Sequence, residues 1–240
     1  MQQRQQLKEL LRSSNNIVFF GGAGVSTESG IPDFRSEDGL YHQKYQYPPE
    51  TIISHSFFVR HTEEFYRFYK DKMLWMDAKP GPAHLALAKL EQAGRLKAVI
   101  TQNIDGLHQA AGSKNVLELH GSVHRNYCQR CGKFYSAQDI LEMEGVPRCT
   151  CGGLIKPDVV LYEESLDSSV INRSVEAIEQ ADVLIIGGTS LVVYPAAGLI
   201  QYYRGHHLVL INRSETPYDS RADLCIHDSI GQVLSEAVAD

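Results

Sequence analysis

The sequence has no long apolar segment. Its 240 residues contain no apolar stretch that approaches the ~20 residues needed for a membrane-spanning helix. The N-terminal residues MQQRQQLKELLRSSNN are polar and lack the apolar centre of a signal peptide. We therefore expect a cytoplasmic protein that has no membrane partner.

The sequence also lacks an excess of positive charge. The chain has 23 basic and 29 acidic residues, which gives a formal net charge of -6. Non-specific nucleic-acid binding needs a basic surface, so we expect no direct nucleic-acid partner. A basic polypeptide would suit this charge better. The sequence also lacks repeats, low-complexity tracts and long linkers, and its length allows one large domain or a domain with a small satellite.

Cysteine is rare, but four of the five cysteines fall within 24 residues. Their spacing is Cys128-x2-Cys131-x17-Cys149-x1-Cys151, and thiols stay reduced in the cytosol, so metal binding is favoured over disulfides or unliganded thiols. Four thiolates fill a tetrahedral shell around Zn2+ and leave no position for water, which predicts one structural zinc ion. The fifth, Cys225, lies between Leu224 and Ile226 and is interpreted as a small buried hydrophobic residue.

Short apolar segments recur along the chain at residues 17–20, 98–100, 183–186 and 208–211. Each is followed by a polar or glycine-rich turn, which is typical of buried parallel strands. Residues 82–93 lie between two of them and predict a helix, with Pro82 at its start and Gly94 after its end. The alternation predicts an α/β fold with a doubly wound, Rossmann-like parallel sheet, whose ligands lie beyond the carboxyl ends of the strands.

Two segments interrupt this alternation. Residues 36–75 are rich in Tyr, Phe and His, and Phe65, Tyr69 and Met73 are spaced as one face of a helix, which indicates packing in a helical lobe. Residues 125–157 hold the cysteines and resemble a zinc ribbon. We expect both to form a small discontinuous domain, inserted in a large domain made of residues 1–35, 76–124 and 158–240.

The first predicted strand leads into the glycine-rich turn GGAGVST at residues 21–27. Glycine here allows the backbone to approach a phosphate near the N–H groups of the next helix. The third glycine of the usual dinucleotide fingerprint is missing, so a tight turn without a ligand is the alternative. Residues 30–35 (GIPDFR) follow as a rigid, charged loop, which could equally be a solvated loop tied by an Asp33–Arg35 pair.

Six segments, taken in order, resemble the sirtuins, the NAD-dependent protein-lysine deacylases, and most of all bacterial members. They are GAGVSTESGIPDFR, TQNIDGLHQAAG, LELHG, the cysteine cluster, KPDVVLYEE and GTSLVVYPAA. The resemblance implies that the carbonyl oxygen of an acyl-lysine attacks the ribose carbon that bears nicotinamide. Nicotinamide leaves, and an alkylamidate intermediate forms. A histidine base, which matches His120, then helps a ribose hydroxyl attack this intermediate, and water completes the release of lysine and O-acyl-ADP-ribose. Histidine suits this role because it accepts a proton near pH 7.

The resemblance also implies the NAD contacts. Ala23, Thr27 and Arg35 match positions near the diphosphate, and Phe34 matches the aromatic that covers the reacting ribose. Within the implied nicotinamide pocket, Asp105 would accept a hydrogen bond from the carboxamide, and Asn103 would position the ribose or a water molecule. The full set of implied NAD contacts is Ala23, Thr27, Phe34, Arg35, Gln102, Asn103, Ile104, Asp105, His120, Thr189, Ser190, Asn212 and Ile230, of which the last four lie on the adenosine side.

The implied partner is an acyl-lysine protein or peptide. It would pair as an added strand with Val159, Val160, Leu161 and Tyr162. Many sirtuins have Phe-Gly where this chain has Tyr162 and Glu163, which leaves residue preferences around the lysine open. Sirtuins that favour succinyl groups carry a Tyr and an Arg three residues apart. Here Tyr66 is followed by Tyr69, so we expect weak activity on acidic acyl groups and better activity on acetyl or longer neutral groups.

Two other functions stay in view beside the deacylase. One is a mono-ADP-ribosyltransferase on the same scaffold, which would pass ADP-ribose to a protein nucleophile. The other is a zinc-ribbon binding module without catalysis, against which the complete set of Asn103, Asp105 and His120 argues. Oligomeric state and the physiological substrate are not indicated by the sequence.

Overall fold

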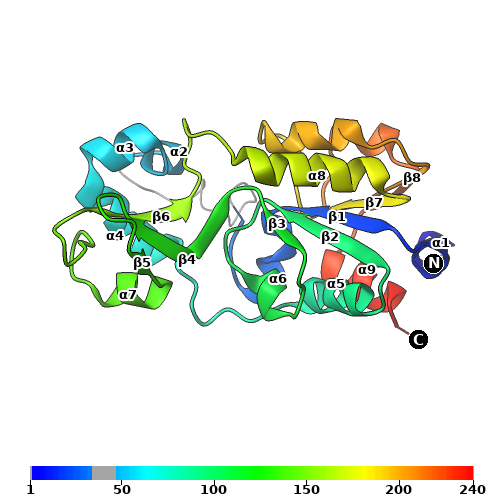
Figure 1. Cartoon of the computed structure of the whole chain (residues 1–240). Helices are drawn as coiled ribbons and strands as arrows, with labels where there is room; N and C mark the ends of the chain where they lie inside the picture. The colour runs from blue at the N-terminus through cyan, green and yellow to red at the C-terminus, as the bar shows by residue number, and fades with distance from the viewer. Residues whose placement is uncertain (1, 34–46, 240) are drawn as a thin grey trace.

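The computed structural model describes residues 2–33 and 47–239. A six-stranded parallel sheet forms its larger part, in the order β3-β2-β1-β7-β8-β9 (Figure 1). The strands are β1 (Ile17–Gly21), β2 (Leu96–Thr101), β3 (Val116–Glu118), β7 (Val183–Gly187), β8 (His207–Ile211) and β9 (Leu224–Ile226). The four strands expected from the sequence are confirmed as β1, β2, β7 and β8, while β3 and β9 are additional.

Both faces of this sheet are buried because helices cover each of them, and alternate side chains of each strand point to opposite faces. Ile17 and Phe19 of β1 pack in one apolar cluster, whereas Val18 and Phe20 pack in the other. The first cluster is covered by α1 (Gln2–Ser13), α5 (Pro82–Gln92) and α9 (Ile230–Ala237), and the second by α8 (Ser168–Gln180) and η4 (Ala196–Tyr202) (Figure 1). The predicted α/β fold is therefore confirmed.

A second, three-stranded antiparallel sheet lies beside the carboxyl ends of the parallel strands (Figure 1). Its strands are β4 (Gly121–Cys128), β5 (Phe134–Tyr135) and β6 (Ile155–Val159), and the helices packed with it are α2 (Pro49–Ile52), α3 (His55–Arg60), α4 (Thr62–Lys72) and α7 (Ala137–Glu142). Phe65 and Tyr69 are buried in the shared core, with Met73 packed against it, so the aromatic stripe serves packing as expected. The residue limits of the two domains stay a prediction.

Sheet order locates the point where a ligand should bind. From β1 the chain proceeds outward through β2 and β3, and from β7 it proceeds outward in the other direction through β8 and β9. The order therefore reverses between β1 and β7, and ligands of doubly wound sheets bind at that reversal, beyond the carboxyl ends of the strands. Within the described residues, no helix is both long and apolar enough to cross a bilayer.

Cys225 differs from its expected environment. It lies in β9 but is only partly buried, and its Sγ is 3.5 Å from Nε2 of His227. The edge position of β9 explains this, because no described strand covers its outer side. Leu224 and Ile226, on the other face of the strand, are buried as expected.

Candidate functional site

A cleft of about 1120 Å³ opens at the carboxyl ends of the parallel strands. Its lining comes from the turns after β1, β2, β7 and β8, from β6 and from the α2–α4 segment. Fourteen residues expected at the site line it: Ala23, Thr27, Gln102, Asn103, Ile104, His120, Val159, Val160, Leu161, Tyr162, Thr189, Ser190, Asn212 and Ile230. Asp105 lies behind this surface, and Phe34 and Arg35 lie outside the described residues. Segments that are far apart in the sequence thus converge on one cleft.

The turns after β1 and β7 meet backbone to backbone. The N–H of Gly24 donates to the carbonyl of Gly188 at 2.8 Å. A Cβ on Gly24 would come within 2.8 Å of the Gly188 Cα, and a Cβ on Gly22 within 2.9 Å of the Thr189 Cβ. Such contacts exclude any larger residue, so the glycines are needed for the close approach of the two turns. The cleft floor here is bare backbone, which fits a diphosphate better than it fits an apolar ligand.

His120 lies in this cleft between β3 and β4. Its Nδ1 is 2.9 Å from the carbonyl oxygen of Gln102. Because a carbonyl oxygen can only accept, Nδ1 carries the hydrogen of the neutral ring and Nε2 carries the lone pair. No hydrogen bond to Nε2 is found among the described residues. Burial lowers the pKa of His120, against the opposing effect of the Gln102 bond, so the ring is neutral at pH 7 and Nε2 can accept a proton.

A buried polar network lies beneath the cleft and centres on Ser26. Its Oγ donates to Oδ2 of Asp105 at 2.6 Å and accepts from Nδ2 of Asn103 at 3.0 Å. His84 completes the network: its Nδ1 accepts from the N–H of Gly81, so Nε2 bears the hydrogen and faces the Ser26 Oγ at 3.4 Å. Burial lowers the pKa of His84, which keeps this ring neutral despite Asp105 nearby.

His84 belongs to the first turn of α5, and its bond from the Gly81 N–H caps the N-terminus of that helix. Its contact with Ser26 was not predicted from the sequence. No sequence signal links these residues, because they are 58 positions apart and meet only when α5 packs against the sheet. Asp105 also accepts from the N–H of Leu107 at 2.9 Å, at the start of α6 (Leu107–Ala110).

The turn after β7 is held by a reciprocal pair of hydrogen bonds. Oδ1 of Asn212 accepts from the N–H of Thr189, and its Nδ2 donates to the Thr189 carbonyl, each at 3.0 Å. Nε2 of Gln102 reaches the Thr189 hydroxyl at 3.3 Å. Each amide atom of Asn212 keeps one further bonding position. The predicted adenosine residues therefore form a rigid cross-strand support as well as a lining.

His108 lies behind the nicotinamide-loop segment and is 1% exposed. Neither of its ring nitrogens has a hydrogen-bond partner among the described residues. Burial, with a smaller effect of His84, lowers the pKa of His108 to about 3. Its ring lies 4.7 Å from the His84 ring, centroid to centroid. His108 is therefore a neutral packing residue behind the loop, and it is not part of the cleft lining.

The four cysteines form one cluster. Their ligand atoms all lie within 4.8 Å of one another, and three of the Sγ pairs are 3.5 or 3.6 Å apart. A disulfide would bring sulfurs to about 2.05 Å, whereas tetrahedral Zn–S bonds of about 2.3 Å place them about 3.8 Å apart. Gly153 allows this arrangement, since a Cβ there would lie 2.6 Å from Sγ of Cys128. The cluster therefore fits one four-coordinate zinc ion, although a single residue separates Cys149 from Cys151 in the sequence.

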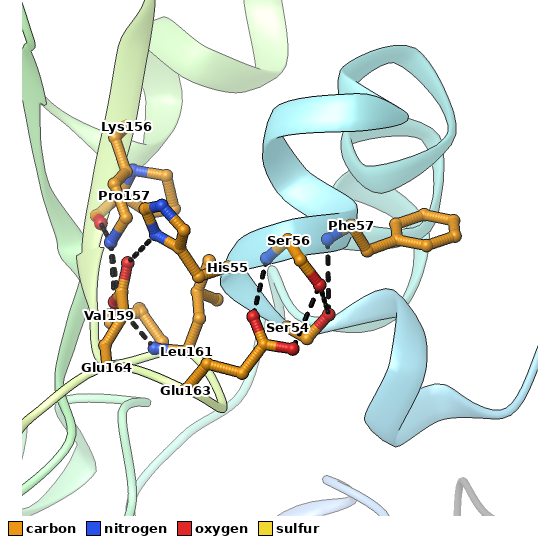
Figure 2. A network of polar contacts seen from close by, with 10 residues as sticks. All are labelled: Ser54, His55, Ser56, Phe57, Lys156, Pro157, Val159, Leu161, Glu163 and Glu164. Carbon is orange, nitrogen blue, oxygen red and sulfur yellow. Dashed lines mark hydrogen bonds and ion pairs between the residues drawn. The ribbon is translucent and has the colours of Figure 1, made fainter.

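The segment after β6 passes directly beside His120. The N–H of Val160 donates to the carbonyl of His120 at 3.0 Å, and Val159 pairs with Gly121 of β4. Beyond it, Glu163 and Glu164 turn toward α3 and bind its first residues (Figure 2). The predicted peptide-binding strand is thus joined to His120 and β4 on one side and to the helical lobe on the other.

Tyr66 and Tyr69 differ in how their hydroxyl groups are used. Tyr66 donates to the carbonyl of Ile155 and is absent from the cleft lining, while Tyr69 lines the cleft beside Ile53 and Met73. The Tyr69 hydroxyl has no hydrogen-bond partner among the described residues. Burial raises the pKa of both hydroxyl groups, so both stay neutral. No described cationic side chain lines the cleft next to them.

Comparisons with known proteins agree with this geometry. The sequence profile of the Sir2 family matches residues 22–195. An NAD-dependent protein deacetylase of Clostridium perfringens is 65% identical over 236 residues, which cover 97% of each chain. A solved Sir2 complex with a p53 peptide and NAD+ is 44% identical, with a TM-score of 0.85 over 96% of this chain and 95% of that one.

A second solved structure is a Sir2 variant with a deacetylated p53 peptide and 3′-O-acetyl ADP-ribose. It is 42% identical and has a TM-score of 0.89, covering 97% of this chain and 96% of that one. The match therefore extends beyond the glycine-rich turn to the whole α/β sheet, the cysteine cluster and the cleft between them. The chain belongs to the Sir2 family, the sirtuins.

Proposed function

We propose that this chain is an NAD-dependent protein-lysine deacetylase that also accepts longer neutral acyl groups. The observation that carries the proposal is His120, whose Nε2 is held ready to accept a proton inside the cleft by the bond from Nδ1 to the Gln102 carbonyl. Family membership and the deacetylase relative support the same activity. Histidine near pH 7 is suited to general-base work, since it changes protonation with little adjustment.

NAD is a substrate consumed in this reaction, and it supplies the ribose carbon that accepts the acyl oxygen. The bare backbone around Gly22, Gly24 and Gly188 suits its diphosphate, and the lining near Ile230, Thr189 and Asn212 suits its adenosine. Gln102, Asn103 and Ile104 line the implied nicotinamide end. Ser26 and His84 hold Asn103 and Asp105 in fixed orientations from below.

His120 takes a proton from a ribose hydroxyl in the second half of the reaction. Proton removal makes that hydroxyl a better nucleophile, and the hydrogen bond at Nδ1 stabilises the imidazolium that results. Asn103 orients the ribose or a water molecule through its amide, whose position Ser26 fixes. The cleft is lined by apolar side chains near His120, including Ile104 and Val160, and these limit the access of bulk water to the reacting groups.

Zinc has a structural role in this proposal. Cys128, Cys131, Cys149 and Cys151 supply all four ligands, so the ion has no position for a substrate or water. It holds together the antiparallel sheet whose strand β6 continues into the peptide-binding segment. His120 is thereby free to act as the base.

The substrate is an acyl-lysine protein or peptide, which adds a strand beside Val159, Val160, Leu161 and Tyr162. Two solved relatives hold a p53 peptide, one with NAD+ and one with 3′-O-acetyl ADP-ribose, which supports a peptide as the substrate. The acyl end of the cleft, near Tyr69 and Met73, is neutral and disfavours a carboxylate. Reduced thiols and NAD are both available in the cytoplasm, and we place the activity there.

The products of one assay test this function. The protein is incubated with NAD and an acetyl-lysine peptide, and the products are separated by mass spectrometry. Deacetylation requires nicotinamide, free lysine peptide and O-acetyl-ADP-ribose in equal amounts. A protein carrying ADP-ribose, without O-acetyl-ADP-ribose, would instead establish the mono-ADP-ribosyltransferase. The absence of any reaction with a zinc-loaded, folded protein would favour a binding module.

A further inference from the structure

The turn after the peptide-binding segment has an unusual backbone. Glu163 has φ of +76°, in the left-handed region that favours glycine, and Leu191 is the one other non-glycine residue with positive φ in the described part of the chain. A glycine would adopt this conformation without strain, so the glutamate needs a compensating interaction.

The carboxylate of Glu163 supplies that interaction by binding the start of α3 (Figure 2). Its Oε2 accepts from the N–H of Ser56 at 2.8 Å, and its Oε1 accepts from the Ser56 hydroxyl at 2.9 Å. The N–H groups of a first helical turn have no partner within the helix, so a carboxylate there is favourable. These bonds, the backbone N–H first, lower the pKa of Glu163, which therefore stays ionised near pH 7.

Further bonds join the same two segments. The N–H of Tyr162 donates to the Ile53 carbonyl at 3.0 Å, and the N–H of His55 donates to the Tyr162 carbonyl at 2.9 Å. Glu164 binds Nδ1 of His55 at 2.8 Å and Nζ of Lys156 at 3.1 Å (Figure 2). The peptide-binding segment is thus attached to the helical lobe at three consecutive residues.

The backbone of Glu163 itself is left available. Neither its N–H nor its carbonyl makes a hydrogen bond to another residue in the described ranges, and Glu163 lines the cleft. The neighbours Tyr162 and Glu164 use their N–H groups, to Ile53 and Leu161 respectively. An unpaired backbone group at the end of a strand edge is what an added peptide strand requires.

We propose that Glu163 is a positioning residue for the acyl-lysine peptide: its carboxylate fastens the left-handed turn to Ser56 and so holds the Glu163 backbone groups in the orientation that pairs with the substrate backbone. This inference rests on the deacetylase function proposed above. Fastening the turn before the peptide arrives reduces the ordering that binding must impose. The same fastening fixes the distance between the segment and Ile53, which lines the acyl end of the cleft.

Glu163→Gly removes the carboxylate but keeps the backbone conformation, because glycine adopts a positive φ without strain. The variant therefore tests the contribution of the carboxylate alone. We expect the KM of an acetyl-lysine peptide to rise by about three- to tenfold, the size expected for a lost charge-assisted hydrogen bond at an exposed site. The KM of NAD and kcat should stay within about twofold of wild type, since neither depends on this turn. A merely structural defect would change all three.

Three further variants complete the experiment. Glu163→Gln keeps an oxygen that accepts from the Ser56 N–H and should restore most of the peptide affinity. Ser56→Ala removes the hydroxyl bond to Oε1 and keeps the N–H that binds Oε2, so it should weaken peptide binding by less than Glu163→Gly. It should add little in the Glu163→Gly background, where the hydroxyl bond is already lost. Glu179→Gln removes an equal charge from an exposed position on α8 and should change nothing.

Peptide affinity is also measured directly, by fluorescence anisotropy of a labelled acetyl-lysine peptide with each zinc-loaded variant. Weaker peptide binding by Glu163→Gly, with the melting temperature kept within about 3 °C of wild type, supports the inference. Unchanged peptide affinity, or an equal rise in the KM of NAD, overturns it. Wild-type protein that binds the peptide but forms no O-acetyl-ADP-ribose contradicts the proposed function alone, since the binding comparison still decides the role of Glu163.

Discussion

Two neighbouring tyrosines of α4, one in the cleft lining and one behind it, allow a matched test of the packing beside the cleft. Tyr66 and Tyr69 are each 1% exposed, and each becomes phenylalanine by the loss of one oxygen atom. Tyr66→Phe takes a hydrogen-bond donor from the Ile155 carbonyl in β6. Tyr69→Phe removes a buried hydroxyl for which no described residue provides a partner. The two changes are equal in volume and opposite in hydrogen bonding.

The expected energies follow from that difference. Loss of a buried neutral hydrogen bond should lower the free energy of unfolding by about 1–2 kcal/mol for Tyr66→Phe. Removal of an unpaired buried hydroxyl should leave that free energy unchanged or raise it by up to about 1 kcal/mol for Tyr69→Phe. The two variants should therefore differ by about 2 kcal/mol, or about 4–8 °C in melting temperature for a chain of this size.

Thermal and urea unfolding of the zinc-loaded proteins measure this difference, with deacetylation of an acetyl-lysine peptide as the check on the cleft. Tyr69→Phe should retain deacetylation, because its ring still lines the cleft. A loss of stability in Tyr69→Phe equal to that in Tyr66→Phe would refute the reasoning, since it would mean that both hydroxyl groups are paired.

Three other predictions concern pH, zinc and the acyl group. Because burial lowers the pKa of His108 to about 3 from 6.5, the unfolded chain binds more protons below pH 6.5, and stability must fall as the pH falls through that range. From pH 7 to pH 5 this costs about 2 kcal/mol, and His108→Gln should lose that part of the pH dependence in urea titrations at the two pH values. Chelation of zinc should abolish deacetylation together with the near-ultraviolet circular dichroism of the small lobe, and an active, fully folded zinc-free protein would contradict the structural role. Since no described cation faces Tyr69, kcat/KM should be higher for an acetyl-lysine peptide than for a succinyl-lysine peptide. A higher kcat/KM for the succinyl-lysine peptide would contradict this prediction and would indicate a group that binds the carboxylate.

Much of the sheet could be predicted because its strands are short, wholly apolar segments bounded by turns. The segment 183–186 is an example, since all of β7 is buried. β9 escaped prediction because it is three residues long at an edge and one of its side chains, Cys225, faces partly outward. α1 was missed because only Leu7 and Leu11 of its polar sequence are buried, which is too few for a clear helical stripe.

The site could be predicted where a residue lies within one or two positions after a strand. Gln102, Thr189 and Asn212 all lie at the ends of strands, so the parallel sheet alone brings them together. The support beneath them could not be predicted, because Ser26, His84 and Asp105 meet only through the packing of α5 and the turn after β2. The left-handed conformation of Glu163 was equally hidden, since a glutamate carries no sequence signal for positive φ.

The central claim is that His120 acts as a base after nicotinamide has left. Exchange of labelled nicotinamide into NAD, measured in His120→Ala with an acetyl-lysine peptide, tests this most directly because it reports the first step alone. We expect exchange to continue while O-acetyl-ADP-ribose formation falls by about 100-fold or more, the usual contribution of a general base. O-acetyl-ADP-ribose formation at near the wild-type rate would contradict the role of His120, and so would loss of exchange and product together in a variant that still binds NAD and peptide.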